Sequence, residues 1–191
     1  MRTCSPHPLK GTGDLMIVRR VVTGRAADGS SVVRMDGQPP RVVQLPSFPD
    51  FRGALVWSTS GVPGLSGNIE DPTPGDASFV PAPGESRLHV MHFPPDSLMW
   101  GPGADTAAIA AEQRAQMPGL ADAFEADGMH ATDTLDYAIV IEGEAWLELD
   151  NGTRTRLTAG DVVIQQGTRH AWRNTSDRRV TVAFVLIGAK R

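Results

Sequence analysis

Most of this chain consists of short runs in which apolar and polar residues alternate, separated by glycine, proline, asparagine or aspartate. A period of two is typical of β-strands with one buried face, and the separating residues are typical of turns. In the last third of the chain a new run begins about every ten residues, the spacing of β-sandwiches and barrels. The strands predicted in this way lie at 16–22, 31–35, 41–45, 53–59, 87–93, 135–142, 144–149, 153–157, 161–165, 170–174 and 179–187. The pattern therefore predicts an all-β, antiparallel barrel or sandwich.

One segment departs from this alternation. Residues 105–116 are rich in alanine, glutamate and glutamine, which favour helix, and Asp105 is placed to cap the helix N-terminus. Pro118 ends the helical pattern, and the residues after it predict a second short helical turn. We therefore expect a helical insertion over about 105–126 that covers one mouth or edge of the β fold.

Composition limits the class of protein. A length of 191 residues suits one domain with its own core, and 20 glycines with 15 prolines suit many short strands joined by turns. The single cysteine, Cys4, excludes an internal disulfide framework and a cysteine-rich zinc site. We expect a single domain over 1–191, with a loose leader at 1–14, a β-rich N-terminal arm within 1–60 and the barrel at 87–187.

Charge and hydropathy limit the partners. The formal net charge is −4, with neither a basic cluster nor a helix-turn-helix pattern, so we expect no nucleic-acid partner. No apolar run approaches the roughly 18 residues of a transmembrane helix, and no apolar stretch follows the first positive charge. These features predict a soluble cytoplasmic protein with no membrane contact.

The candidate chemistry lies in two segments of the last third. His130, Thr132 and Asp136 share parity, so an extended backbone would direct them to one side. His170 and Trp172 share parity in the second segment. If the two segments face each other inside a small barrel, two imidazoles and a carboxylate can hold a divalent metal and leave positions open for substrate, water or dioxygen. The alternative is that these residues are ordinary hydrogen-bonding or surface groups of strands, and their spacing leaves both interpretations open.

The same two segments resemble the paired motifs of the cupin superfamily, whose small barrels are antiparallel double-stranded β-helices of jelly-roll type. The resemblance is firmest over 128–187, about a third of the chain. Its second motif is the more specific match. The residues that occupy family positions in that motif are Gly160, Asp161, Gly167, His170 and Asn174. The resemblance implies a single-domain cupin barrel that carries the helical insertion and the N-terminal arm.

The first motif departs from the family pattern. Cupins that bind metal typically use three histidines and one glutamate, whereas Thr132 here stands in place of the second histidine and Asp136 replaces the glutamate. The resemblance implies His130 and His170 as metal ligands, with Asp136 as a shorter carboxylate ligand or Asp133 in its place. Thr132 is implied to hydrogen-bond a metal-bound water.

The family resemblance implies an enzyme that uses Fe, Zn, Mn or Ni on a small organic molecule. A Lewis-acidic metal at His130, Asp136 and His170 would chelate a small keto or carboxylic acid and stabilise an enolate. That chemistry favours a decarboxylase, lyase or isomerase, with Thr132 completing the expected catalytic set. An iron-dependent dioxygenase is one alternative, and a barrel that binds a small ligand without turning it over is another.

Three further residues are expected at the substrate. Trp172 shares the parity of His170 and is expected to stack on a flat substrate. Strand 87–93 carries His89 on one face and His92 on the other, so one of them should reach the cavity, and we assign that role to His92. Asp133 is the third expected contact. The β-rich arm further predicts a homodimer, because such barrels commonly pair through N-terminal strands.

Overall fold

The computed structural model describes residues 17–65, 70–75 and 78–191. The leader expected at 1–14, with Cys4, and Met16 at the start of the first expected strand lie outside these residues. The strands are β1 (Arg20–Arg25), β2 (Ser31–Gly37), β3 (Val42–Leu45), β4 (Phe48–Thr59), β5 (Ser86–Phe93), β6 (Thr134–Glu142), β7 (Glu144–Leu149), β8 (Arg154–Thr158), β9 (Val162–Gln166), β10 (His170–Arg173) and β11 (Val180–Gly188). The helices are α1 (Asp96–Met99) and α2 (Thr106–Gln116), with short 3-10 helices at Ala121–Ala123 and Asp150–Gly152.

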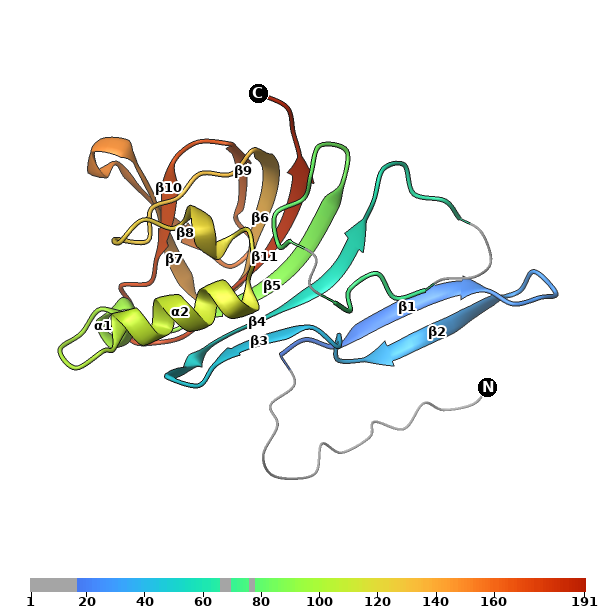
Figure 1. Ribbon diagram of the computed structural model, residues 1–191, viewed down its shortest axis with the longest axis horizontal. Helices are drawn as coiled ribbons and strands as arrows, with labels where there is room; N and C mark the ends of the chain where they lie inside the picture. The colour runs from blue at the N-terminus through green and yellow to red at the C-terminus, as the bar shows by residue number, and fades with distance from the viewer. Residues whose placement is uncertain (1–16, 66–69, 76–77) are drawn as a thin grey trace.

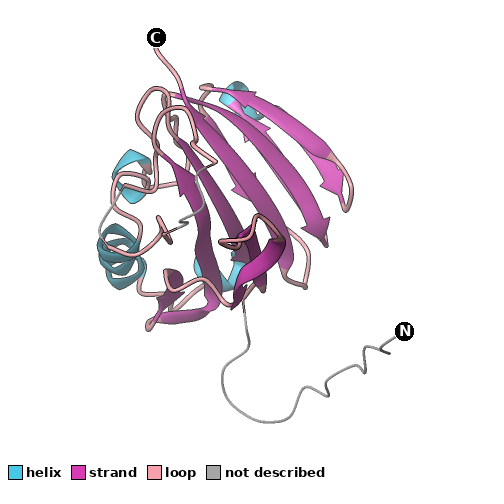
Figure 2. Ribbon diagram, turned by 90° about the vertical axis from the view of Figure 1, so that its right-hand side faces the viewer, coloured by secondary structure: helices cyan, strands magenta, loops and turns pink. Residues whose placement is uncertain are grey.

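The barrel consists of two antiparallel sheets. The larger has six strands in the order β3-β4-β5-β11-β6-β9, and the smaller has three in the order β10-β7-β8. Figure 2 shows the long strands of the large sheet running side by side. Buried side chains from both sheets form one core, which includes Leu45, Leu55, Val182, Leu147 and Leu157. This arrangement confirms the antiparallel barrel predicted from the alternation and the double-stranded β-helix implied by the resemblance.

Glycine at position 143 is required by the close approach of another strand. Gly143 joins β6 to β7 with φ +84°. A Cβ on Gly143 would lie 2.7 Å from the carbonyl oxygen of Arg179 and 3.0 Å from the Cα of Val180. Any side chain would therefore force the start of β11 away from this turn.

The helical insertion has the predicted cap and stop. The Asp105 side chain accepts a hydrogen bond from the Ala108 amide at 2.9 Å, and α2 ends at Gln116, before Pro118. Ile109 of α2 and Met117, directly after it, are buried in the main core, so the helix packs on the barrel through these residues. Figure 1 shows α2 lying across the barrel. The position of α2 confirms the insertion expected before the last β block.

The N-terminal arm covers part of the outer face of the large sheet. Ile17 and Val18 pack against a second apolar cluster that contains Val90. Buried Arg20 is ion-paired with Asp71 and fixes the start of β1. Beyond that contact, β1 and β2 form a separate two-stranded sheet that projects from the barrel at the end opposite α1 (Figure 1). Among the described residues, no helix is both long and apolar enough to cross a membrane.

Candidate functional site

A cavity of about 470 Å³ lies between the two sheets and beneath α2. Its lining is mainly apolar, with polar or charged side chains from α1, α2, β5, β6, β10 and the segment before β6. Among the apolar lining residues are Phe51, Met91, Phe93, Phe124, Trp172 and Phe184. A cavity of this size and composition suits a small organic molecule held mainly by apolar contact.

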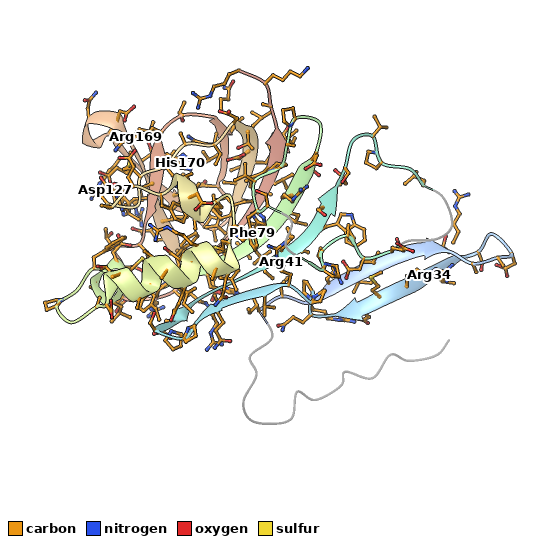
Figure 3. The ribbon with its side chains drawn as sticks, viewed as in Figure 1. Arg34, Arg41, Phe79, Asp127, Arg169 and His170 are labelled. Atoms are coloured by element: carbon orange, nitrogen blue, oxygen red, sulfur yellow. The ribbon has the colours of Figure 1, made fainter. Side chains whose placement is uncertain are left out.

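His130 and His170 meet on one wall of this cavity. Their backbones exchange two hydrogen bonds, each of 2.9 Å, and their ring centroids lie 4.3 Å apart. His170 opens β10, in the smaller sheet, and is labelled in Figure 3. The two imidazoles therefore meet in the barrel, as predicted from the parity of the residues in the two segments.

Both rings are held in the same tautomer by backbone carbonyls. Nδ1 of His130 lies 3.2 Å from the carbonyl oxygen of Gly128, and Nδ1 of His170 lies 2.9 Å from that of Thr168. A carbonyl oxygen can only accept, so each Nδ1 carries the proton and donates it. Nε2 of each neutral ring is left with a lone pair that can accept a proton or bind a metal.

The two imidazoles are uncharged at neutral pH. Burial lowers the pKa of His130 to about 4, and the neighbouring His170 ring adds to this effect by repelling a positive charge. Burial also lowers the pKa of His170, while the Thr168 carbonyl acts in the opposite direction. Both rings are therefore available as proton acceptors.

The inward side of β6 and of the residues before it contributes a row of polar groups. Thr132 and Thr134 hydroxyls lie 2.7 Å apart, and Asp136 follows on the same face. Oδ1 of Asp136 is buried without a hydrogen-bond partner in the described part of the chain. Burial raises the pKa of this carboxyl to about 6, opposed by the Thr134 hydroxyl. Thr132 and Asp136 both line the cavity.

The side chains do not complete the expected three-ligand metal centre. Within residues 17–65, 70–75 and 78–191, no group of three or more His, Cys, Asp or Glu side chains is close enough to hold an ion. His130 and His170 provide a pair of nitrogen donors, but Asp136 lines the cavity without joining them as a third ligand. An aspartate is one methylene shorter than the family's glutamate, which reduces the reach of its carboxylate from β6. A site of the predicted type needs three protein ligands, so the residues as placed do not fit it.

The three residues expected at the substrate lie in different places. Trp172 lines the cavity, edge-on to His170 at 6.2 Å and to Phe184 at 5.2 Å between ring centroids. His92 faces the outside of the sheet, where its ring hydrogen-bonds the Thr181 hydroxyl and the Ile17 carbonyl. Asp133 is an exposed residue ion-paired with Arg191. Neither His92 nor Asp133 lies on the cavity wall.

His89 is the histidine of β5 that reaches the cavity. Its side chain is 2% exposed, and its ring stacks on Phe79 with centroids 4.9 Å apart. Burial lowers the pKa of His89 to about 3, and the positive charges of Arg87 and Arg41 add to the effect. The alternation over 87–93 identifies His89 and His92 as the two candidates, but it carries no signal for which face is inward.

Comparison with known proteins places these features in a family. The family model for the cupin domain matches residues 122–187. The cupin-domain-containing oxidoreductase srdB of Neurospora crassa is 43% identical over 174 residues, which cover 90% of this chain and 74% of that protein. Phomopsin biosynthesis cluster protein C' of Diaporthe leptostromiformis is 50% identical over 63 residues, so the match spans only 33% of that relative's length and 32% of this chain.

A solved structure is also similar to this chain. A cupin 2 conserved barrel domain protein from Salinispora arenicola CNS-205 is 19% identical, with a TM-score of 0.40 over 76% of this chain and 80% of that one. The extent of the match to the Neurospora protein is what decides the family. This chain belongs to the cupin family.

Proposed function

We propose that this cupin is an enzyme that encloses a small, largely apolar molecule and transfers a proton at that molecule through His130 and His170. One observation carries the proposal. The ring centroids of two neutral imidazoles, each with Nδ1 bound to a backbone carbonyl oxygen, lie 4.3 Å apart on the wall of a mainly apolar cavity. This tautomer leaves Nε2 of both rings as a proton acceptor at neutral pH.

The arrangement supports lyase or isomerase chemistry. When a neutral imidazole within hydrogen-bond reach takes the proton from a carbon next to a carbonyl group, the electron pair of the C–H bond moves to the carbonyl oxygen as an enolate, and the imidazolium then returns a proton to carbon. Asp136, on β6 of the large sheet, lines the same cavity and carries a carboxyl group that can exchange a proton with the substrate. The apolar lining excludes water and so favours proton transfer between the protein and the substrate.

The lining favours a neutral substrate over the small keto acid of the decarboxylase hypothesis. Arg173 lines the cavity but is already ion-paired with Glu148 at 2.6 Å. Arg114, on α2, is exposed at the cavity edge. A substrate carboxylate would therefore lose its water without gaining a buried, uncommitted cation among the described lining residues.

Deuterium exchange tests the proton transfer. The protein would be incubated in D₂O with a panel of neutral alkyl ketones and alkyl-substituted 1,3-diketones, and deuterium at the α-carbon would be followed by NMR. We expect catalysed exchange by the natural protein and at least a tenfold loss in His170→Gln. His92→Gln is the matched control, because it replaces a histidine on the outer face of the sheet and should leave the rate unchanged. Equal rates in all three proteins would overturn the proposal.

A second candidate is an oxidoreductase, which the name of the Neurospora relative favours. In that case the reaction would require an oxidant or reductant, such as dioxygen at a divalent iron. Metal analysis of protein purified without added metal, followed by oxygen uptake with iron(II) and the same ketones, separates the two candidates. Stoichiometric iron with substrate-dependent oxygen uptake supports the oxidoreductase. Binding without exchange or oxygen uptake supports a barrel that only binds its ligand.

We also propose that the protein forms a homodimer. The outer faces of β6 and β9 expose neighbouring apolar residues, in which Tyr137 pairs with Ile164 and Ile139 pairs with Val162. Light scattering coupled to gel filtration should give a dimer mass for the natural protein and a monomer mass for Ile164→Glu. Val62→Glu, in the loop after β4 and outside both this face and the N-terminal arm, is the control for an exposed valine. A natural protein that is monomeric at all concentrations contradicts the homodimer.

A further inference from the structure

His89 lines the cavity and has one buried ring nitrogen that no described residue binds. Nε2 of His89 is buried and has no hydrogen-bond partner among the residues that the structure describes. Asp136 shares this property, since its Oδ1 is also buried and unpaired on the same cavity. His89 belongs to the large sheet, whereas His170 belongs to the small one, so the two imidazoles lie on different sheets of the barrel.

The fold itself does not need a polar group at this position. The register of the large sheet places His89 opposite Phe184 on β11, and Phe79 stacks on the ring from the other direction. Leucine or phenylalanine would satisfy such surroundings, while an unpaired buried nitrogen lowers stability. A histidine on a cavity wall that keeps an unpaired ring nitrogen is a candidate to bind a polar group of a ligand.

The chemistry of the missing partner follows from the charge state of the ring. Arg87 and Arg41 oppose a positive charge on His89, and Arg87 already binds Glu85 and the Ser78 carbonyl. A cationic ligand group would be repelled by the same arginines. A neutral imidazole offers one donor and one acceptor, and a hydroxyl group complements either atom.

We propose that His89 is a substrate-recognition residue that hydrogen-bonds a hydroxyl group on an otherwise apolar substrate. This inference rests on the proposed function only in using the same cavity. The hydroxyl group would lie against the large sheet, and the reacting carbon would lie toward His130 and His170. Recognition of the hydroxyl group then depends on His89, which the alternation of the sequence does not distinguish from His92 on the outer face.

Two probes of nearly equal shape test the hydroxyl group: 4-propylphenol and propylbenzene. Isothermal titration calorimetry gives the ratio of their dissociation constants for each protein. We expect a clear preference of the natural protein for 4-propylphenol. Because a buried hydrogen bond between neutral groups contributes about tenfold in affinity, His89→Leu should reduce the preference by about that factor. Propylbenzene should bind the variant at least as tightly as the natural protein.

Two further variants make the result specific. His89→Gln keeps a donor and an acceptor and should retain most of the preference, which a purely structural role of the ring would not predict. His92→Leu removes the other histidine of β5, which lies on the outer face of the sheet and outside the cavity, and should leave the ratio unaltered. The inference is overturned if His89→Leu and His89→Gln both keep the natural ratio. It is also overturned if only His170→Leu abolishes the preference, because the hydroxyl group would then bind at the other wall.

The binding experiment and the deuterium-exchange experiment test the two proposals separately, so one proposal can fail while the other holds. If His170→Gln leaves deuterium exchange unchanged while His89→Leu loses the phenol preference, the catalytic proposal is wrong and the recognition site stands. Equal affinity of the natural protein for both probes removes the hydroxyl site and leaves the exchange result unaffected. If neither probe binds the natural protein, the inference that the cavity takes an apolar hydroxyl compound is wrong.

Discussion

His130 and His170, far apart in the sequence, are joined by two backbone hydrogen bonds and hold their ring centroids 4.3 Å apart. The same type of hydrogen bond orients each ring, from Nδ1 to the carbonyl oxygen of the residue two positions earlier in the chain. No charged partner is needed to set the tautomer. The pair is thus fixed by the backbone, and a side-chain substitution at one member changes the electrostatics of the other without moving it.

Removing one ring should raise the pKa of the other. Burial and the His170 ring both hold the pKa of His130 down to about 4. In His170→Ala the repulsion disappears and water gains access, so the pKa of His130 should rise toward its ordinary value. A titration of the ring signals by heteronuclear NMR measures this change, with His92→Gln as the control. An unchanged pKa of His130 would show that the rings are not coupled.

Asp136 should make the protein less stable as the pH rises. The folded-state pKa is raised to about 6 from an ordinary value near 3.8, so the folded protein binds the proton more tightly than the unfolded chain does. The stabilisation is full below the unfolded pKa and is lost as pH rises through about 6. Asp136→Asn should therefore gain about 1 kcal/mol of unfolding free energy relative to the natural protein between pH 5 and pH 8. Urea denaturation at the two pH values measures it, and exposed Asp177→Asn should show no such gain.

His89 should make the protein less stable as the pH falls, which is opposite to the effect of Asp136. Its folded-state pKa is lowered to about 3, so between that value and about 6.5 only the unfolded chain takes up a proton. The stability contributed by the neutral ring is full above about 6.5 and is lost as pH falls. His89→Leu should reduce the loss of unfolding free energy between pH 6.5 and pH 5 by about 2 kcal/mol. If guanidine denaturation gives His89→Leu and Met91→Leu the same acid dependence, the buried neutral state of His89 is contradicted.

The helix over the cavity should loosen when one side chain is shortened. Gln116 holds the end of α2 to β3 by two hydrogen bonds of 2.8 Å. Its Oε1 accepts from the backbone amide of Gln44, and its Nε2 donates to the Gln44 carbonyl oxygen. Two such bonds at a partly exposed site contribute about 1 kcal/mol, so Gln116→Ala should increase amide exchange of α2 about fivefold. Hydrogen–deuterium exchange measured by mass spectrometry tests this prediction. Arg114→Ala on the same helix is the control and should leave the exchange rate near that of the natural protein.

Asn174 should be a structural residue of the second motif. Its side-chain amide donates to the carbonyl oxygens of Phe93 and Arg178, and its Oδ1 accepts from Ser176. The residue is almost fully buried, so Asn174→Ala leaves buried carbonyls unpaired and should cost about 3 kcal/mol of unfolding free energy. Denaturation by urea measures the loss. Asp177→Ala, a fully solvated neighbour, should be neutral, and a similarly small effect at Asn174 would contradict the structural role.

The sequence alone predicts the strands of the barrel with few errors in position. Alternation with a period of two over 135–187, with turns at Gly143 and Gly167, depends on local backbone geometry, and such patterns are visible in sequence. The cap at Asp105 is equally local, and its predicted role is confirmed. The resemblance to the cupin motifs extends the prediction to His130 and His170, whose meeting the structure shows.

The composition of the cavity wall could not be predicted in the same way. Leu88, Val90 and His92 form one face of β5, and Arg87, His89 and Met91 form the other, so both faces offer a histidine and apolar residues. The N-terminal arm decides between them, since Ile17 covers the outer face and binds His92 there.

What the sequence by itself determined about this protein is the strand order in the chain, the turns, the helical insertion and the pair of histidines. Only the tertiary structure decided that His89 rather than His92 faces the cavity, and that Asp136 lines the cavity without reaching the histidine pair. Parity assigns a side chain to one of two faces. Which face is buried, and how far a side chain reaches across the barrel, depend on segments distant in the sequence that pack against it.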